Sequence, residues 1–569
     1  MGKMKKVKSL LCILMVLVMA FTLFACNKDN SSSNDNSPAG GSSSPAGSGS
    51  SPAGGGSSPA GGANEGTSGG AQPGDDNWVS ITVGTDDYLG RFLAGLNPAE
   101  SWMGCDAIYD TIFRTDPKTK QVFSYVLKDW YWQDDTTLIM EMRDDVYFSN
   151  GDNATAEDII YSYYSHIVRG SNYLNDFGMI WDETKALDTY TAQFKVEKPF
   201  PIFVNTSIYL IDASWSESVG YDSMEWYRPV CSGPYYVYDW VDDSNMILRS
   251  RGDDYWNKDV GPIYVDEWIV RYYPDSSTMY MALEIGDIAM CAVQDTDYSR
   301  FLKSGGDGFD VELVQTGTVL YMCFSFNEGD TDIWYDKRLR EAIAVGADWD
   351  QIGQAAQGDY YIPARSIASS LSPDYIETGK YEYNPEKAKA LLAECGYGPG
   401  NPLKIFTVTM DSPMLRNGFE SFQYFMEQIG VEATFEFADV STALSYWLVP
   451  GDTEYGFWWS VGANPTYAVR NAINEAWDPG GVSYDYVPFP EFLEHFEILL
   501  RSTDDAAKSA AGKWIQQYMY DEIIYIPVTE FAFSVGWRED VFTKQQVLDY
   551  QLSRGNYQLS RLGLASAWK

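Results

Sequence analysis

Histidine, the side chain most often used as a general base, occurs only twice in the 569 residues, at His166 and His495. Both lie in helix-like apolar patterns, which favours a place on a helix surface. The sequence has no HExxH zinc motif, no CxxC, no GxSxG nucleophile elbow and no phosphate-binding P-loop. Its many carboxylates leave a glycosidase-type pair open by count alone, but no pattern supports one. We therefore predict that the protein is not an enzyme and holds no metal or other cofactor.

The cysteine with the most specific context is Cys26, which ends the segment Leu23-Phe24-Ala25-Cys26. The apolar stretch from Leu10 to Phe24 is shorter than the roughly 20 residues of a membrane-spanning helix. Four basic residues precede it: Lys3, Lys5, Lys6 and Lys8. The arrangement resembles a bacterial lipobox, so we predict a signal peptide over 1–25 and lipidation of Cys26. A plain secretory signal followed by a coincidental cysteine is the alternative.

Residues 26–77 are predicted to be the lipidated cysteine and a flexible tether. The sequence Ser-Pro-Ala-Gly recurs at Ser37, Ser44, Ser51 and Ser58, and the stretch contains few residues that could form a core. The folded body that follows is acidic, since the whole chain carries a formal charge of −40. Such a body is repelled by nucleic acid and anionic lipid. We expect no nucleic-acid partner, and membrane contact through the lipid anchor only.

Five cysteines remain after Cys12 and Cys26 are set aside, so at least one is unpaired and no disulfide framework is implied. They are Cys105, Cys231, Cys291, Cys323 and Cys395. Their spacing is too wide for a zinc motif.

The elements that would position a binding site alternate between helix and strand. Asn384-Pro385 is typical of a helix start, with Gly396 just beyond its end. Thr155 and Asp158 form a variant of the capping box, and Asp336 is expected to cap another helix. The runs 138–142, 263–272 and 319–326 have strand character. We predict a mixed α/β fold of two or three domains in the body of about 490 residues.

The order of these segments resembles the extracellular solute-binding proteins of the oligopeptide and dipeptide class of ABC importers. Each segment is weak alone, but their collinear order over about 400 residues is specific. The segments are Tyr109-Asp-Thr-Ile-Phe113, Leu127-Lys-Asp-Trp130, Met142 to Asp158 with its Ser-Asn-Gly turn, Ser232-Gly-Pro-Tyr235 with Asp254-Tyr-Trp256, Asn327 with Asp336 to Ala342, and Asn384 to Tyr397.

The resemblance implies a two-lobe periplasmic-binding-protein-like clamp with an extra inserted subdomain in the N-terminal lobe. Lobe 1 would cover 78–326 with the insert at about 116–227, lobe 2 would cover 327–527, and 528–569 would return to lobe 1. Strands near Phe326 and Val528 would form the hinge. The protein would be exported to the outer face of the bacterial cytoplasmic membrane and deliver its solute to the permease subunits of an ABC transporter.

The resemblance also indicates where a solute would bind. Peptide binders of this class use W-x-x-D-x-x-(D/E)-P, whose first Asp pairs with the peptide ammonium. Here Trp458 and Pro465 fit the spacing, Asn464 takes the second acidic place and Val461 takes the first, so the amine-pairing carboxylate is missing. Asp86 or Asp87 could substitute for it. The remaining candidate ligand-binding residues are Tyr88, Phe457, Trp459 and Tyr467.

A peptide is the expected solute, and an oligosaccharide is the alternative. Phe457, Trp458 and Trp459 could pack on the apolar faces of sugar rings, or they could be core residues. Two further classes stay open at this point: a secreted hydrolase, and a surface adhesin or sensor.

Overall fold

The computed structural model describes residues 77–85, 92, 104–115, 122–169, 178–199, 208–221, 223–241, 244–260, 262–293, 308–324, 326, 333–372, 374–410, 413–438, 457–462 and 489–551. The predicted signal peptide, Cys26 and the tether lie outside these residues. Within them, no helix has both the length and the apolar character needed to cross a membrane.

The first strand of the described chain joins a four-stranded sheet in the order β1-β10-β9-β8. β1 pairs in parallel with β10, whereas β10, β9 and β8 pair antiparallel in turn. Val83, Leu248, Trp268 and Val270 are buried in its core. The strands are β1 (Ser80–Thr85), β8 (Tyr235–Val241), β9 (Asn245–Ser250) and β10 (Glu267–Tyr272).

A second four-stranded sheet, ordered β4-β5-β7-β6, falls within the range predicted for the inserted subdomain. β5 is buried along almost its whole length, because its sequence Thr-Leu-Ile-Met-Glu-Met supplies apolar residues to both faces. Tyr163 of α3 packs on Phe194 of β7, with ring centroids 4.9 Å apart. The elements are β4 (Leu127–Asp134), β5 (Thr137–Met142), α3 (Ala156–Tyr164), β6 (Lys185–Ala186) and β7 (Thr191–Lys195).

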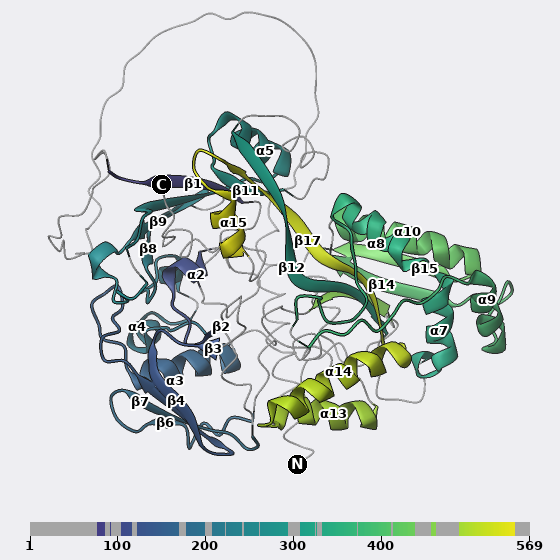
Figure 1. Cartoon of the computed structure of the whole chain (residues 1–569), viewed down its shortest axis with the longest axis horizontal. Helices are drawn as coiled ribbons and strands as arrows, with labels where there is room; N and C mark the ends of the chain where they lie inside the picture. The colour runs from purple at the N-terminus through teal and green to yellow at the C-terminus, as the bar shows by residue number, and fades with distance from the viewer. Residues whose placement is uncertain are drawn as a thin grey trace, which may run out of the picture. The chain divides into compact units, whose positions relative to one another are not determined.

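Two long strands, β12 (Phe309–Phe324) and β17 (Tyr525–Arg538), form the middle of a third sheet. They run antiparallel, side by side, through most of their length (Figure 1). β11 (Met290–Val293) pairs with the later part of β17, and β16 (Phe457–Gly462) pairs with the later part of β12. A short strand, β13 (Ile362–Pro363), also pairs with β17.

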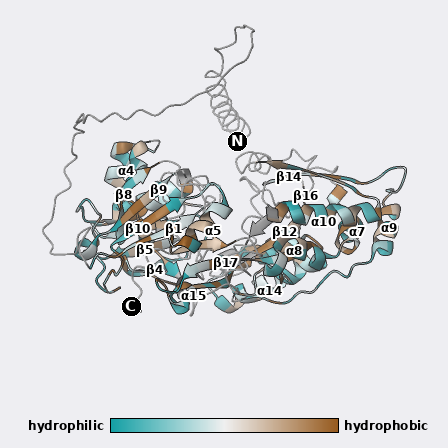
Figure 2. Cartoon of the chain, turned by 90° about the horizontal axis from the view of Figure 1, so that it is seen from above, coloured by the Kyte–Doolittle hydropathy of each residue, from teal (hydrophilic) through white to brown (hydrophobic). Residues whose placement is uncertain are grey.

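A parallel pair of strands and several helices follow β12 along the chain. β14 (Lys404–Met410) pairs with β15 (Glu432–Ala438). Hydrophilic and hydrophobic residues alternate along α7, α8, α9 and α10, as expected for helices with one buried side (Figure 2). The helices are α7 (Lys337–Gly346), α8 (Trp349–Gln357), α9 (Pro385–Glu394), α10 (Pro413–Ile429), α13 (Pro490–Arg501) and α14 (Asp505–Asp521).

The largest apolar core links these helices to the two long strands. Met322 of β12 and Ile526 of β17 are fully buried in it, together with Ile343 of α7 and Phe422 of α10. The long strands, which belong to the same sheet as β11, are therefore connected with the helical part of the chain through side-chain packing.

Candidate functional site

The predicted aromatic residues and Val461 lie on β16, next to the later half of β12. The register places Phe457 opposite Phe324, Trp458 opposite Cys323, Trp459 opposite Met322 and Val461 opposite Leu320. Successive residues of a strand belong to opposite faces of its sheet. Phe457, Trp459 and Val461 are therefore assigned to one face of the sheet, and Trp458 to the other.

The other predicted site residues lie outside the described residues. These are Cys26, Asp86, Asp87, Tyr88, Asn464, Pro465 and Tyr467. The structure therefore gives the strand that leads into the candidate site, and the assignment of individual ligand-binding residues remains a prediction.

The carboxyl end of β16 lies beside an interruption in the pairing of the two long strands. Gln315 pairs with Ala532 and Val319 pairs with Glu530, so residues 316–318 of β12 correspond to Phe531 alone on β17. Gly462, the last residue of β16, is opposite Val319. A bulge of this kind bends a strand and often occurs next to functional sites. We take this junction of β16, β12, β17 and β13 as the candidate solute site.

Glu530 is the charged side chain at this junction, and sequence reasoning missed it. It is only 2% exposed. Its carboxylate accepts hydrogen bonds from the Ser369 hydroxyl at 2.8 Å and from the Ser370 N–H at 3.0 Å. The Gln315 side-chain amide also donates to it. A single acid within the apolar run Tyr-Ile-Pro-Val-Thr-Glu-Phe-Ala-Phe was the signal that could have identified it.

The loop that donates to Glu530 is fixed by a nearby ion-pair cluster. Asp350 of α8 pairs with Arg365 at 3.0 Å and with Lys380 at 2.7 Å. The Tyr361 hydroxyl donates to the same carboxylate at 2.5 Å. Burial alone would raise the pKa of Asp350, but the hydrogen bonds from Lys380, Tyr361 and Arg365 lower it to about 2. Asp350 therefore stays charged and pairs with Arg365.

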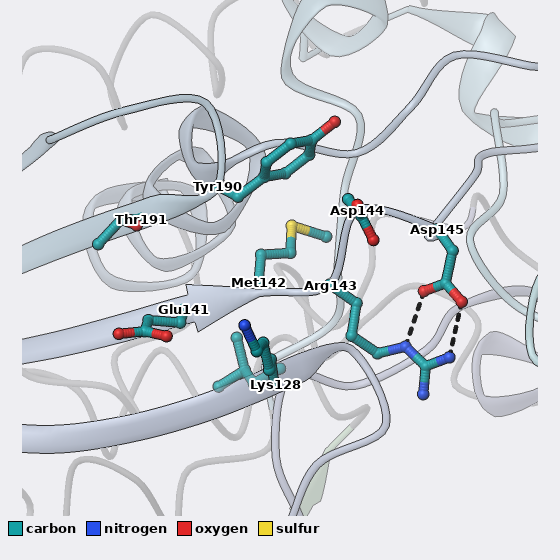
Figure 3. Close-up of a pocket in the computed structure, with 9 residues that line it drawn as sticks. Lys128, Glu141, Met142, Arg143, Asp144, Asp145, Tyr190 and Thr191 are labelled. Atoms are coloured by element: carbon teal, nitrogen blue, oxygen red, sulfur yellow. Dashed lines mark hydrogen bonds and ion pairs between the residues drawn. The ribbon is translucent and has the colours of Figure 1, made fainter.

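A separate polar hollow of about 670 Å³ lies on the β4-β5-β7 sheet (Figure 3). Arg143 spans its rim and binds Asp145 through two hydrogen bonds of 2.8 Å. This pairing lowers the pKa of Asp145. The lining combines both signs of charge without a buried, unsatisfied group, which is typical of a solvated surface. The lining residues are Leu127, Lys128, Glu141, Met142, Arg143, Asp144, Asp145, Tyr190 and Thr191.

Neither histidine has the setting of a general base. His495 stacks on Trp514 with ring centroids 3.5 Å apart, as a helix-surface residue can. His166 is buried, so its predicted place on a helix surface was wrong. The apolar pattern continues past α3 into a short π-helical turn, which rotates His166 inward, where Nδ1 lies 2.7 Å from the Ser162 carbonyl.

No group of three or more His, Cys, Asp or Glu in the described ranges could hold a metal ion.

Comparison with known proteins identifies the family of this chain. Residues 99–480 match the bacterial extracellular solute-binding proteins, family 5. The chain belongs to this family. The predicted resemblance is thereby confirmed.

Individual curated relatives support the same assignment. The oligopeptide-binding protein AppA of Bacillus subtilis is 24% identical over 309 residues, which are 52% of this chain and 55% of AppA. The nickel-binding protein NikA of Staphylococcus aureus is 26% identical over 389 residues, which are 64% of this chain and 73% of NikA. The chain thus matches about half to three quarters of the length of these curated relatives.

Solved structures establish the fold. The substrate-binding protein CtaP of Listeria monocytogenes superposes with a TM-score of 0.70 at 18% identity, covering 85% of this chain and 99% of CtaP. AppA of Bacillus subtilis in complex with a nonapeptide gives a TM-score of 0.66 at 19% identity, covering 82% of this chain and 96% of AppA. These are two-lobe binding proteins, so the predicted fold class is confirmed.

Several family 5 motifs serve as structural supports in this chain. Asp158, from the segment Met142 to Asp158, joins the starts of two helices. It accepts from the Thr155 N–H at 2.7 Å and from the Ala213 N–H, the first residue of α4 (Ala213–Val219), at 2.8 Å. Burial, with the nearby charge of Asp212 adding to it, raises the pKa of Asp158 despite these bonds.

A second family 5 motif builds a buried polar network around Asp110. Its carboxylate accepts from the Tyr255 hydroxyl at 3.1 Å and from the Trp256 indole N–H at 3.0 Å. Arg251 donates to surrounding backbone carbonyls, including that of Gly233 at 3.1 Å. These bonds hold the Gly-Pro-Tyr and Asp-Tyr-Trp segments together. None of these bonds involves a residue of the β16 junction.

Proposed function

We propose that the protein is an exported, lipid-anchored receptor of an ABC importer, which binds a peptide-type solute between two lobes and delivers it to a membrane permease. The observation that carries this proposal is the family 5 match over residues 99–480, together with a fold that covers 99% of CtaP. AppA, one of the relatives, is named as an oligopeptide-binding protein and is solved with a nonapeptide. The proposal extends that solute class to this chain.

The sequence around β16 is compatible with a peptide, although it lacks the usual acid. Val461 stands where an ammonium-pairing Asp is expected, so a charged peptide N-terminus needs another carboxylate. A buried ammonium without a partner would carry a large desolvation penalty. A peptide binder of this kind must therefore carry a substitute acid elsewhere at the site.

Two other solute classes receive less support. NikA is named for nickel, but the described residues of this chain hold no group of three potential metal ligands. A metal-chelate solute would therefore have to bring its own ligands to that part of the protein. The oligosaccharide alternative gains no support from AppA, NikA or CtaP.

Uptake of a labelled tripeptide mixture by cells with and without the protein tests the transport function. We expect uptake to fall when the protein is removed and to return when it is restored. Unchanged uptake of every peptide tested, together with reduced uptake of another solute, would contradict the peptide assignment.

The anchor is tested by Cys26→Ser. We expect this variant to incorporate no fatty acid and to leave the membrane pellet, because the thioether-linked lipid can no longer form. Continued lipid labelling of the variant would show that the anchor is elsewhere.

A further inference from the structure

Glu530 occupies the centre of the junction described above. It pairs with Val319 of β12 on one side and with Ile362 of β13 on the other. Gly462, at the end of β16, is in the same row, two strands away. With strands about 4.8 Å apart, the backbone of Glu530 is about 10 Å from that of Gly462. The Glu530 carboxylate is therefore close enough to the predicted binding segment for one short peptide to contact both.

The contacts of Glu530 leave its charge uncompensated among the described residues. All three of its hydrogen-bond donors are neutral: the Ser369 hydroxyl, the Ser370 N–H and the Gln315 amide. Arg365, the cation on the same loop, is held by Asp350. A buried carboxylate is stable only when a cation or several hydrogen bonds replace its hydration. The three neutral donors replace part of the hydration of the carboxylate but bring no positive charge.

The two carboxylate oxygens are unequally occupied. Oε2 accepts from both Ser369 and Gln315, whereas the one donor to Oε1 among the described residues is the Ser370 N–H. Because an ionised carboxylate has about four acceptor sites, Oε1 can take one further donor. Ser370, whose backbone N–H donates to Oε1, is itself an exposed residue.

We propose that Glu530 is the carboxylate that pairs with a cationic group of the solute, the N-terminal ammonium in the case of a peptide. It thereby takes the electrostatic role that Val461 cannot fill. The ammonium donates to Oε1, and the three protein donors hold the carboxylate in place before the solute arrives. This inference rests on the proposed peptide-binding function and adds the residue that recognises the charge.

Calorimetric titration of the purified protein with a free peptide and its N-acetylated form tests the inference. The probe is the peptide that raises the melting temperature of the wild-type protein most. We expect wild type to prefer the free amine. Glu530→Gln should lose at least about tenfold in affinity for the free peptide and little for the acetylated one, because only the charge pair is removed.

Ser369→Ala is the matched control. It removes one of the neutral donors to Glu530 but leaves the charge, so the preference for the free amine should persist. If Glu530→Gln fails to fold, Gln315→Lys provides a second test. An internal ammonium beside Glu530 should compete with the solute and abolish the preference without altering Glu530.

Two results would overturn the inference while leaving peptide binding intact. One is a wild-type protein that binds free and acetylated peptide equally well. The other is a folded Glu530→Gln or Gln315→Lys variant that keeps the wild-type preference for the free amine. If wild type binds neither form of any peptide, the proposed peptide function fails and this inference fails with it.

Discussion

Arg340, which lies in one of the family segments, supports the turn before β17. Its side chain is 1% exposed, and its guanidinium donates to the carbonyls of Glu522 at 2.7 Å and Ile523 at 3.0 Å. Ile523 follows the end of α14 and has φ of 54°, a conformation that a β-branched residue rarely adopts. Arg340 satisfies the carbonyls that this turn leaves free, just before β17 begins. Burial lowers the pKa of Arg340 to about 10, so it remains charged at neutral pH.

We expect Arg340→Lys to lower the free energy of unfolding by about 2–4 kcal/mol, because a lysine cannot reproduce the planar fork of donors. Urea denaturation measures this change. Arg338→Lys is the control, since Arg338 is half exposed and pairs with Asp336 at the start of its own helix, so its effect should stay within about 0.5 kcal/mol. Equal effects of the two substitutions would contradict the role assigned to Arg340.

The Asp350 cluster predicts a pH dependence of stability. The folded-state pKa of Asp350, about 2, is below the ordinary value of 3.8. Its contribution is therefore complete above about pH 4 and is lost as the pH falls from about 4 towards 2. Asp350→Asn should lower the free energy of unfolding at pH 7 by about 1–2 kcal/mol, after allowance for partial exposure.

The difference between wild type and Asp350→Asn, measured by denaturation, should shrink as the pH approaches 2. A difference that stays constant from pH 7 to the acid limit would show that Asp350 contributes through packing and not through its charge.

At the scale of elements, local rules predicted helix starts well and strand lengths less well. α9 begins at Pro385 with the Asn384 side chain accepting from the Lys387 N–H at 3.0 Å, as the capping pattern indicates. α7 is capped by Asp336 in the same way. The run 263–272 becomes a strand only from Glu267, and β12 begins ten residues before the predicted run. Strand limits depend on partners far away in sequence, such as β1 and β17, and local patterns do not contain them.

The alternation along β16 predicts that its two adjacent tryptophans act differently. Because Trp458 and Trp459 belong to opposite faces of the sheet, we expect only one of Trp458→Ala and Trp459→Ala to weaken solute binding by about 1–3 kcal/mol. The other should mainly lower the melting temperature. Calorimetric titration and thermal denaturation of both variants separate the two effects. Equal losses of affinity with unchanged stability would contradict the register of β16.

The substitution Val461→Asp places a carboxylate on β16 at the position where the ammonium-pairing Asp is expected. If the solute carries its ammonium near this position, the new carboxylate should be tolerated or should improve affinity for the free peptide. A neutral solute should bind the variant more weakly, since the substitution buries a charge with no partner. The comparison is made by titration with free and acetylated peptide.

At the scale of the whole molecule, the order of weak motifs predicted the family and the two-lobe fold before any tertiary contact was known. The predicted domain limits at 326 and 527 remain predictions, although the long strands β12 and β17 end and begin close to them. The solute site was less predictable. The role proposed for Glu530 depends on the convergence of β12, β13 and the 366–370 loop on β17, and no sequence spacing reveals that convergence.

Two-lobe closure predicts a change in the size of the molecule. Saturation with a bound peptide should reduce the radius of gyration of the purified protein, because such clamps close around their solute. Small-angle X-ray scattering with and without the peptide measures it. Tight, saturating binding with an unchanged scattering profile would count against closure.

The most direct test of the central claim is a thermal-shift screen of the purified protein. One panel holds dipeptides to pentapeptides, and the other holds disaccharides to pentasaccharides at matched concentrations. A ligand at 100 times its dissociation constant contributes about 2.7 kcal/mol to the folded state, which is enough to move the melting temperature measurably. We predict that at least one peptide raises the melting temperature and that no oligosaccharide does. A shift with an oligosaccharide, or the absence of a shift with every peptide, would contradict the assignment of this protein as a peptide-binding receptor.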